Sequence, residues 1–332
     1  MIPIDDDKAP SPAPGTLGTE GADRRYRGLD SWPTRVVLEA LWAGQSRAVS
    51  ACLEALPALE RAVDGAVERL AGSTGRLIYV GAGSSGMIAA LDALDLGATF
   101  NWPEARTLVF IAGGLDVGPN LVRGPDPLVE DDAAAGRDRA REAQLGTADV
   151  VVGLSASGNS AYTVAVLEEA HRRGAMTVAV TSRADSAAAR AADHAVVMVT
   201  GPEVIAGSTR LGAGTAQKLV LNLLSTTVMV GLGAVFDNFM IDLRPANAKL
   251  RQRQVAIVAT IAEVDAPAAA DALARHGDVK RAVLGLAGLA ASEIDAALSS
   301  AGGNLRTALD RARSKDRSSD RSSDRSARSR ST

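Results

Sequence analysis

Two short loops rich in serine and glycine hold the residues best suited to chemistry. Residues 81–86 read GAGSSG and residues 155–160 read SASGNS. Glycine lets backbone N–H groups approach a ligand closely, and serine hydroxyls add hydrogen-bond donors. Neither loop contains the lysine of a nucleoside-triphosphate P-loop. Together the loops predict a site for a phosphorylated sugar held by hydroxyl groups, with candidate ligands Ser84, Ser85, Gly86, Ser155, Ser157, Asn159 and Ser160.

The segments around these loops predict how they are positioned. Apolar runs at 76–81 and 149–154 precede the loops, and helical spacing follows each loop, so a positive helix end would favour an anion there. Similar β-rich runs occur at 107–112, 176–181 and 194–199. Their alternation with helical segments predicts an α/β fold, a three-layer sandwich with a parallel sheet. Ligands of such sheets bind at the carboxyl ends of the strands, where both loops fall.

The composition predicts four regions along the chain. Residues 1–16 are rich in proline and acidic residues and are predicted to be disordered. Residues 17–263 form the ligand-binding domain with its N-terminal helices, in which Pro33 and Pro57 mark helix starts or breaks. A small helical domain covers residues 264–312. The tail, 313–332, repeats DRSS and is predicted to be disordered and of low complexity.

Charge and cysteine content restrict the class of protein. The formal net charge of −3 over 332 residues argues against nucleic-acid or membrane-surface binding as the main function. Cys52 is the single cysteine, which excludes an intrachain disulfide and favours a reducing compartment. The first residues lack the pattern of a signal peptide and no apolar run has bilayer length, so we expect a cytoplasmic protein. The three histidines have no metal-ligand spacing, and no metal site is expected.

Residues 201–222 form a third informative segment. Together with 81–86, 130–132 (EDD) and 150–160, this segment resembles the sequence signature of the N-acetylmuramic acid 6-phosphate etherases. That family has the sugar-isomerase (SIS) fold and is related to glucokinase regulatory protein. The resemblance extends from about residue 19 to about residue 309. It implies a homodimer with its active site near the subunit interface, and it adds Glu203, Ser208 and Arg210 to the substrate-binding candidates.

The family reaction removes D-lactate from the sugar and leaves N-acetylglucosamine 6-phosphate. A base must take the proton at carbon 2, which is acidic beside the aldehyde of the open-chain sugar. An acid must protonate the lactyl oxygen that leaves carbon 3, and water then adds to the unsaturated intermediate. Two carboxyl groups in different environments can divide these roles, without a metal or redox cofactor. The resemblance implies Glu130 as the base, and the acid position of the family corresponds to Asp95.

Several positions depart from the family pattern. Asp95 replaces a glutamate and is one methylene shorter, and a displacement of about 1 Å can cost roughly 10²-fold in rate. Met87 and Gly212 replace an arginine and a lysine of the family. Asp95 could equally be a solvated helix carboxylate, and Glu130 a carboxylate that complements a helix dipole. Arg210 could bind phosphate or pair with Glu203.

Three functions follow from these observations. The leading hypothesis is a lyase that cleaves the D-lactyl ether of N-acetylmuramic acid 6-phosphate. The second is a regulator or sensor that binds a sugar phosphate but has weakened catalysis, favoured by Met87, Asp95 and Gly212. The third is an aldose–ketose isomerase, which the signature at 201–222 makes less favourable.

Overall fold

The computed structural model describes residues 18–114, 116–118, 121–123, 129–245 and 247–314. The segments predicted to be disordered, 1–16 and nearly all of 313–332, therefore lie outside the described residues. The chain divides into two compact units. The first contains the residues up to Asp95 together with Pro103–Val228, and the second contains Leu96–Trp102 and the chain from Met229 onward.

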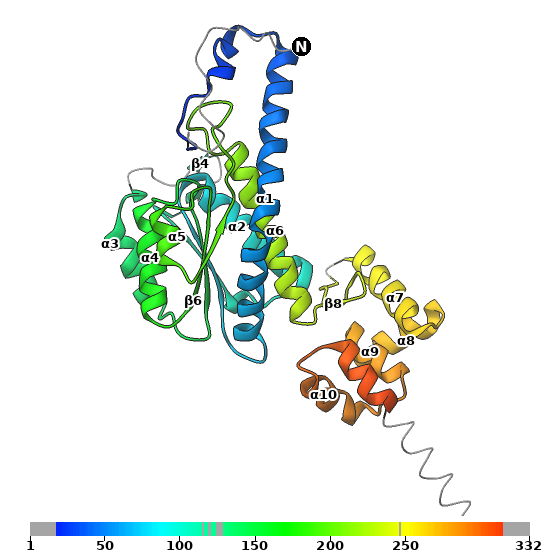
Figure 1. Ribbon diagram of the computed structural model, residues 1–332. Coiled ribbons are helices and arrows are strands. Elements are labelled where there is room, and N and C mark those ends of the chain that lie inside the picture. The colour runs from blue at the N-terminus through cyan, green and yellow to red at the C-terminus, as the bar shows by residue number, and fades with distance from the viewer. Residues whose placement is uncertain (1–17, 115, 119–120, 124–128, 246, 315–332) are drawn as a thin grey trace, which may run out of the picture. The chain divides into compact units, whose positions relative to one another are not determined.

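The first unit contains a five-stranded parallel sheet, which confirms the predicted α/β fold (Figure 1). Its strands, in the order β2-β1-β5-β6-β7, all fall within the five predicted runs. The three central strands are buried along their whole length, because helices cover both faces of the sheet. The strands are β1 (Leu77–Gly81), β2 (Thr107–Ile111), β5 (Val150–Leu154), β6 (Met176–Thr181) and β7 (His194–Val197).

Helices form the two outer layers of this unit. Ile78 and Val80 of β1 pack into the core that also contains Val166 and Leu167 of α4. Tyr79, on the opposite face of the same strand, contacts Asp92 of α2. Figure 1 shows α3, α4 and α5 on one side of the sheet and α1, α2 and α6 on the other. The helices are α1 (Thr34–Leu70), α2 (Gly83–Phe100), α3 (Ala133–Glu142), α4 (Ala161–Arg172), α5 (Ala187–Ala191) and α6 (Gly212–Gly231).

The strand order brings the two serine-rich loops together. Strand β1 lies between β2 and β5, so the connections that leave β1 and β5 meet at a change of direction in the sheet. Gly81 and Leu154, the last residues of β1 and β5, are paired in register. The loops that follow them therefore begin side by side, at the position where parallel sheets bind ligands.

Helix α1 is long and begins where the sequence predicted. Pro33 occupies the N-cap position, but the helix continues through Pro57, so the predicted break at Pro57 is wrong. Proline removes one intrahelical hydrogen bond at a cost of roughly 3 kcal/mol. Burial of residues on both sides of it, including Ala55 and Leu59, offsets that cost.

The second unit is mainly helical and has its own hydrophobic core. Ile257 and Val258 pack with Ala269 and Val283. Asp265 accepts a hydrogen bond from a backbone N–H of the helix that it precedes, a local signal that is visible in the sequence. Helix α7 shares this core, so the domain boundary predicted between residues 263 and 264 falls within the second unit. The predicted domain boundaries stay a prediction. Its helices are α7 (Ala248–Ala262), α8 (Ala266–His276), α9 (Val279–Leu286) and α10 (Ala291–Ser300).

The remaining described elements are short. No single helix in the described part of the chain is long and apolar enough to cross a bilayer; α9 and α10 pass that test only as a pair bent by 116°. The short strands form two antiparallel pairs, β3 with β4 and β8 with β9. The short elements are η1 (Arg24–Tyr26), η2 (Leu29–Ser31), η3 (Glu104–Arg106), β3 (Asp116–Gly118), β4 (Leu121–Arg123), β8 (Val235–Phe236) and β9 (Phe239–Met240).

Candidate active site

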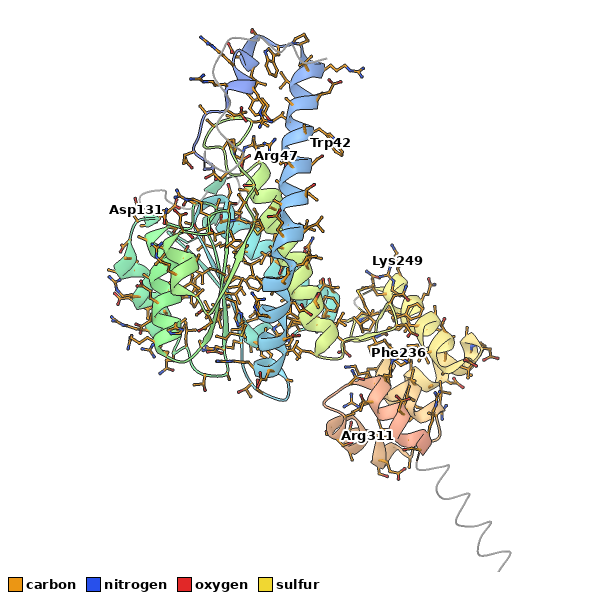
Figure 2. All side chains as sticks on the ribbon, viewed as in Figure 1. Trp42, Arg47, Asp131, Phe236, Lys249 and Arg311 are labelled. Atoms are coloured by element: carbon orange, nitrogen blue, oxygen red, sulfur yellow. The ribbon has the colours of Figure 1, made fainter. Side chains whose placement is uncertain are left out.

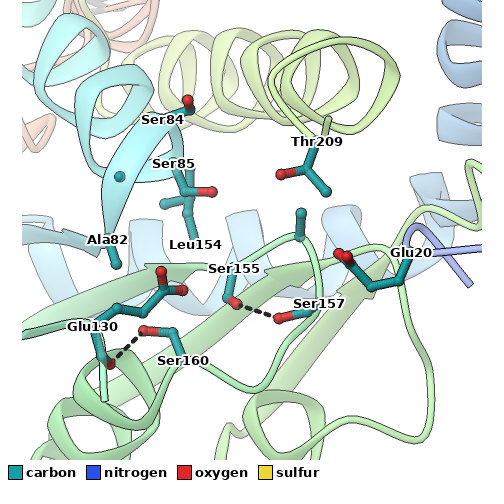
Figure 3. Close-up of a pocket in the computed structure, with 12 residues that line it drawn as sticks. Glu20, Ala82, Ser84, Ser85, Glu130, Leu154, Ser155, Ser157, Ser160 and Thr209 are labelled. Carbon is teal, nitrogen blue, oxygen red and sulfur yellow. Dashed lines mark hydrogen bonds between the residues drawn. The ribbon is translucent and has the colours of Figure 1, made fainter. Parts of the chain in front are cut away.

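A cavity of about 210 Å³ opens at the carboxyl edge of the sheet, between the two serine-rich loops (Figure 3). It brings together six of the residues that the sequence predicted: Ser84, Ser85, Ser155, Ser157, Ser160 and Glu130. Glu20 and Thr209 complete its polar lining, and the rest is Ala82, Gly83, Leu154 and Ala156.

The first loop folds back tightly onto the end of β1. A Cβ atom at Gly81 would lie 2.7 Å from the backbone nitrogen of Gly86, so only glycine fits there. Gly83 starts α2 with a φ of +50°, and Ser84 and Ser85 follow in its first turn. The N–H groups of a first helical turn lack intrahelical acceptors and carry the positive end of the dipole. This loop therefore offers backbone donors and two hydroxyls to an anion.

The second loop is held in shape by its own hydrogen bonds. The backbone N–H of Gly158 donates to Ser155 Oγ at 3.0 Å, and the Ser155 and Ser157 hydroxyls lie 3.5 Å apart. Ser160 caps α4 by accepting from the N–H of Thr163. Asn159 Oδ1 instead accepts from the N–H of Ala187, so this predicted ligand fixes the start of α5 and does not line the cavity.

Glu130 projects into the cavity from a backbone that is fixed to helix α4. Its carbonyl oxygen accepts hydrogen bonds from the N–H of Tyr162 at 3.0 Å and from the Ser160 hydroxyl at 3.4 Å. Asp132, and not Glu130, is the N-cap residue of helix α3. Burial raises the pKa of Glu130 above its ordinary value, and the negative charge of Asp131 raises it further. A carboxylate of raised pKa is a stronger base.

Asp95 lies in a different part of the same unit. It follows Ser84 by eleven residues on α2, about 16 Å along the helix axis. Its side chain is 61% exposed, and Lys218 Nζ lies 3.6 Å from Asp95 Oδ2. Asp95 does not line the cavity, so a single chain does not bring it to Glu130.

A buried carboxyl group next to Asp95 was not found from the sequence. Asp92 is 2% exposed and accepts hydrogen bonds from Tyr79 Oη at 2.8 Å and from Ser225 Oγ at 3.3 Å. Burial raises the pKa of Asp92, and it raises that of Tyr79 as well. Lys218 Nζ lies 3.7 Å from Asp92 Oδ1, so Lys218 bridges Asp92 and Asp95. The cluster joins β1, α2 and α6 and thereby fixes how α2 approaches the cavity.

The 201–222 segment mainly builds the start of helix α6. Glu203 is 4% exposed and accepts the N–H groups of Gly212 and Ala213, each at 2.9 Å. Glu203 therefore binds the positive end of α6, and neither of these contacts involves Arg210. A Cβ atom at Gly212 would lie 3.0 Å from Glu203 Oε2, which explains why a small residue suits that position. In this segment Thr209 reaches the cavity, whereas the predicted ligands Glu203, Ser208 and Arg210, like Gly86 in the first loop, do not line it.

Glu20 is a cavity residue that sequence reasoning missed. Figure 3 shows its carboxylate facing the cavity from the side opposite Glu130. Its neighbour Thr19 accepts the N–H of Gly207, which places this segment beside Thr209. A single acidic residue between Thr19 and Gly21 gives no motif, so no local signal could have identified it. The described lining residues therefore include two carboxylates and no lysine or arginine.

Comparisons with known proteins show the family of this chain. Residues 133–227 match the SIS domain family. An N-acetylmuramic acid 6-phosphate etherase of Symbiobacterium thermophilum is 45% identical over 81% of this chain and 88% of its own. Etherases of Deinococcus radiodurans and Rubrobacter xylanophilus are each 40% identical, over 88% and 90% of this chain and 94% and 98% of theirs. With these similarities over most of its length, the chain belongs to the N-acetylmuramic acid 6-phosphate etherase family.

Proposed function

We propose that this protein is a carbon–oxygen lyase that cleaves the D-lactyl ether of N-acetylmuramic acid 6-phosphate. The products are N-acetylglucosamine 6-phosphate and D-lactate, and the reaction serves the recycling of cell-wall amino sugars in the cytoplasm. The observation that carries the proposal is a carboxylate of raised pKa, Glu130, in a serine-lined cavity of a chain from this family.

The phosphate group binds to the hydroxyls and backbone donors of the two loops. Ser84 and Ser85 lie in the first turn of α2, and Ser155 and Ser157 lie opposite them. A site of neutral donors and a helix N-terminus suits a phosphate without a lysine. Because Glu20 and Glu130 face the same cavity, the phosphate binds at the loop side and the sugar carbons extend toward the carboxylates.

Glu130 takes the proton from carbon 2 of the open-chain sugar. The C–H electron pair forms the carbon 2–carbon 3 double bond, and the bond from carbon 3 to the lactyl oxygen breaks. D-Lactate leaves once that oxygen has taken up a proton, and water then adds at carbon 3. The attachment of the Glu130 carbonyl to Tyr162 and Ser160 fixes the base relative to the serines that hold the phosphate.

The proposal includes a homodimer in which Asp95 supplies the acid. Large apolar side chains are exposed along α1 and α2, and Trp42 projects away from the sheet domain (Figure 2). Trp42 is 75% exposed and Leu94, next to Asp95, is also 75% exposed. An exposed apolar surface of this kind supports pairing of two copies. Pairing through α2 would place Asp95 at the interface, near the site of the second copy.

The second candidate function is a sensor that binds sugar phosphates without turnover. It is favoured by the distance of Asp95 from the cavity of its own chain and by the shorter side chain at that position. The test incubates purified protein with N-acetylmuramic acid 6-phosphate and measures D-lactate. Turnover that is lost in Glu130→Gln supports the lyase. Thermal stabilisation by the sugar phosphate without release of D-lactate supports the sensor. If the sugar phosphate causes neither turnover nor stabilisation, both proposed functions are contradicted.

A further inference from the structure

The hydroxyl of Ser85 has a buried partner on helix α6. Ser85 Oγ lies 3.0 Å from Oε1 of Gln217, whose residue is 1% exposed. In the described part of the chain, Gln217 Nε2 is buried and has no hydrogen-bond partner. A buried donor that stays unpaired costs roughly 1–3 kcal/mol. The pair therefore combines a residue of the cavity with an unpaired donor directly behind it.

The direction of this hydrogen bond decides what Ser85 can offer a ligand. A hydroxyl has one proton to donate and two lone pairs to accept with. When Ser85 donates to Gln217 Oε1, it has no proton left for an anion in the cavity. A half-turn of the Gln217 amide brings Nε2 to Ser85 Oγ instead. Gln217 then donates, its unpaired donor gains an acceptor, and the Ser85 proton is free to point into the cavity.

We propose that Gln217 is a positioning residue for phosphate: its Nε2 donates to Ser85 Oγ when the site is occupied, so that Ser85 donates to the phosphate. This inference rests on the proposed binding of a sugar phosphate. It matters because the described cavity lining supplies no cation and two carboxylates, so that each donor contributes substantially to holding a dianion. Gln217 lies behind Ser85 and does not itself line the cavity.

The experiment compares three variants by calorimetric titration with N-acetylglucosamine 6-phosphate and with unphosphorylated N-acetylglucosamine. Ser85→Ala should weaken binding of the phosphorylated sugar roughly 10- to 100-fold, as for loss of a hydrogen bond to a charged group. Gln217→Glu at pH 8 should give a loss of similar size, because a carboxylate can only accept, so that the Ser85 hydroxyl donates its hydrogen bond to that carboxylate and not to the phosphate. Gln217→Met, apolar and of similar size, should weaken binding only about 2- to 5-fold, because the Ser85 proton stays available but its hydroxyl is no longer oriented by a donor.

Two further measurements distinguish this positioning role of Gln217 from a merely structural one. The loss in Gln217→Glu should shrink relative to wild type as pH falls, because the protonated carboxyl group can donate to Ser85. In the Ser85→Ala background, Gln217→Glu should cost much less, because only charge repulsion remains. An unchanged affinity in Ser85→Ala, or equal losses in Gln217→Glu and Gln217→Met, would overturn the inference. If Gln217→Glu does not fold, Gln217→Met decides: binding of the phosphorylated sugar equal to wild type would overturn the inference, and a loss of about 2- to 5-fold would support it.

Failure of this inference is distinct from failure of the lyase assignment. D-Lactate release by wild type together with an unchanged affinity in Ser85→Ala refutes the role of Gln217 alone. Absence of D-lactate release together with the predicted losses in phosphate affinity refutes the lyase and keeps the phosphate anchor.

Discussion

Lys218 on helix α6 lies 3.6 Å from the carboxylate of Asp95 on helix α2. The same ammonium group lies 3.7 Å from the buried Asp92 and donates to Asn222 Oδ1 at 2.8 Å. Asp95, the proposed acid, therefore contacts the neighbouring helix through Lys218. Any movement of Asp95 toward a substrate must work against this contact.

A longer side chain at residue 95, the proposed acid, should bring the carboxyl group closer to the lactyl oxygen that leaves. We expect Asp95→Glu to release D-lactate faster than wild type, up to about 10²-fold if the shorter side chain misplaces the carboxyl group by about 1 Å. Asp95→Asn should be slower than wild type with nearly unchanged binding of N-acetylglucosamine 6-phosphate. The matched control is Asp64→Asn on α1, which should leave the rate unchanged. Equal rates in Asp95→Glu, Asp95→Asn and wild type would remove Asp95 from the mechanism.

Glu130→Gln should abolish the base while keeping the shape of the cavity. We expect D-lactate release to fall roughly 10²- to 10⁴-fold, with affinity for N-acetylglucosamine 6-phosphate retained. Exchange of the carbon 2 proton with deuterated water should fall in parallel, because the same group removes that proton. A variant that loses lactate release but keeps the exchange would show that Glu130 acts later than proton removal.

The pH profile should report the environment of Glu130. Its pKa is raised, and the base works only when ionised, so kcat/KM should fall on the acid side at a higher pH than for an ordinary glutamate. Asp131 contributes to this shift through its negative charge. Asp131→Asn should therefore lower the pKa of Glu130 and move the acid limb to lower pH. Asp138→Asn, in helix α3, is the control and should leave the limb in place.

Glu20 should weaken the binding of phosphate by like-charge repulsion. Glu20→Gln removes one of the two carboxylates that face the cavity, so affinity for inorganic phosphate should rise by about 3- to 10-fold at low ionic strength. The gain should shrink in 0.5 M salt, where charges are screened. Glu60→Gln, an exposed glutamate on α1, should not change the affinity. A decrease in phosphate affinity on Glu20→Gln would instead indicate that Glu20 organises the site.

The stability of the first unit should depend on a buried carboxylate in helix α4. Glu169 is 3% exposed, and contacts with Arg172 and Arg173 lower its pKa to about 2. Because this folded-state pKa is depressed, the stabilisation is present above the unfolded value of 4.5 and is lost as pH falls toward about 2. Glu169→Gln should lower the free energy of unfolding at pH 7 by about 1–3 kcal/mol. Thermal unfolding of the exposed neighbour variant, Glu168→Gln, should match wild type.

The exposed apolar side chains of α1 should determine self-association. Trp42 is 75% and Leu53 is 69% exposed, and both lie on this one helix. Trp42→Asp or Leu53→Asp should shift the protein from dimer to monomer in sedimentation velocity at micromolar concentration. Arg61→Glu, a polar substitution on the same helix, should leave the oligomeric state unchanged. A wild-type monomer would contradict the proposed homodimer.

Local sequence patterns determined most of the sheet and the position of the two serine-rich loops. Five β-rich runs, several of them apolar throughout, predicted all five parallel strands, because strands covered on both faces need few polar residues. The serine loops were found from their composition and their place after strands. Pro57 shows the limit of this reasoning. The cost of a proline within α1 can be estimated from the local sequence, but the burial that offsets this cost depends on packing against other elements.

Only the tertiary structure decided which polar residues meet. Sequence reasoning grouped Glu203 and Asn159 with the substrate ligands, yet the structure uses them to hold the starts of α6 and α5. The tertiary structure places Glu20 opposite Glu130 and Gln217 behind Ser85. The physical reason is that chemistry at a site depends on distances between residues far apart in the chain. Spacing along one helix or strand fixes only local distances; packing of whole elements fixes the others.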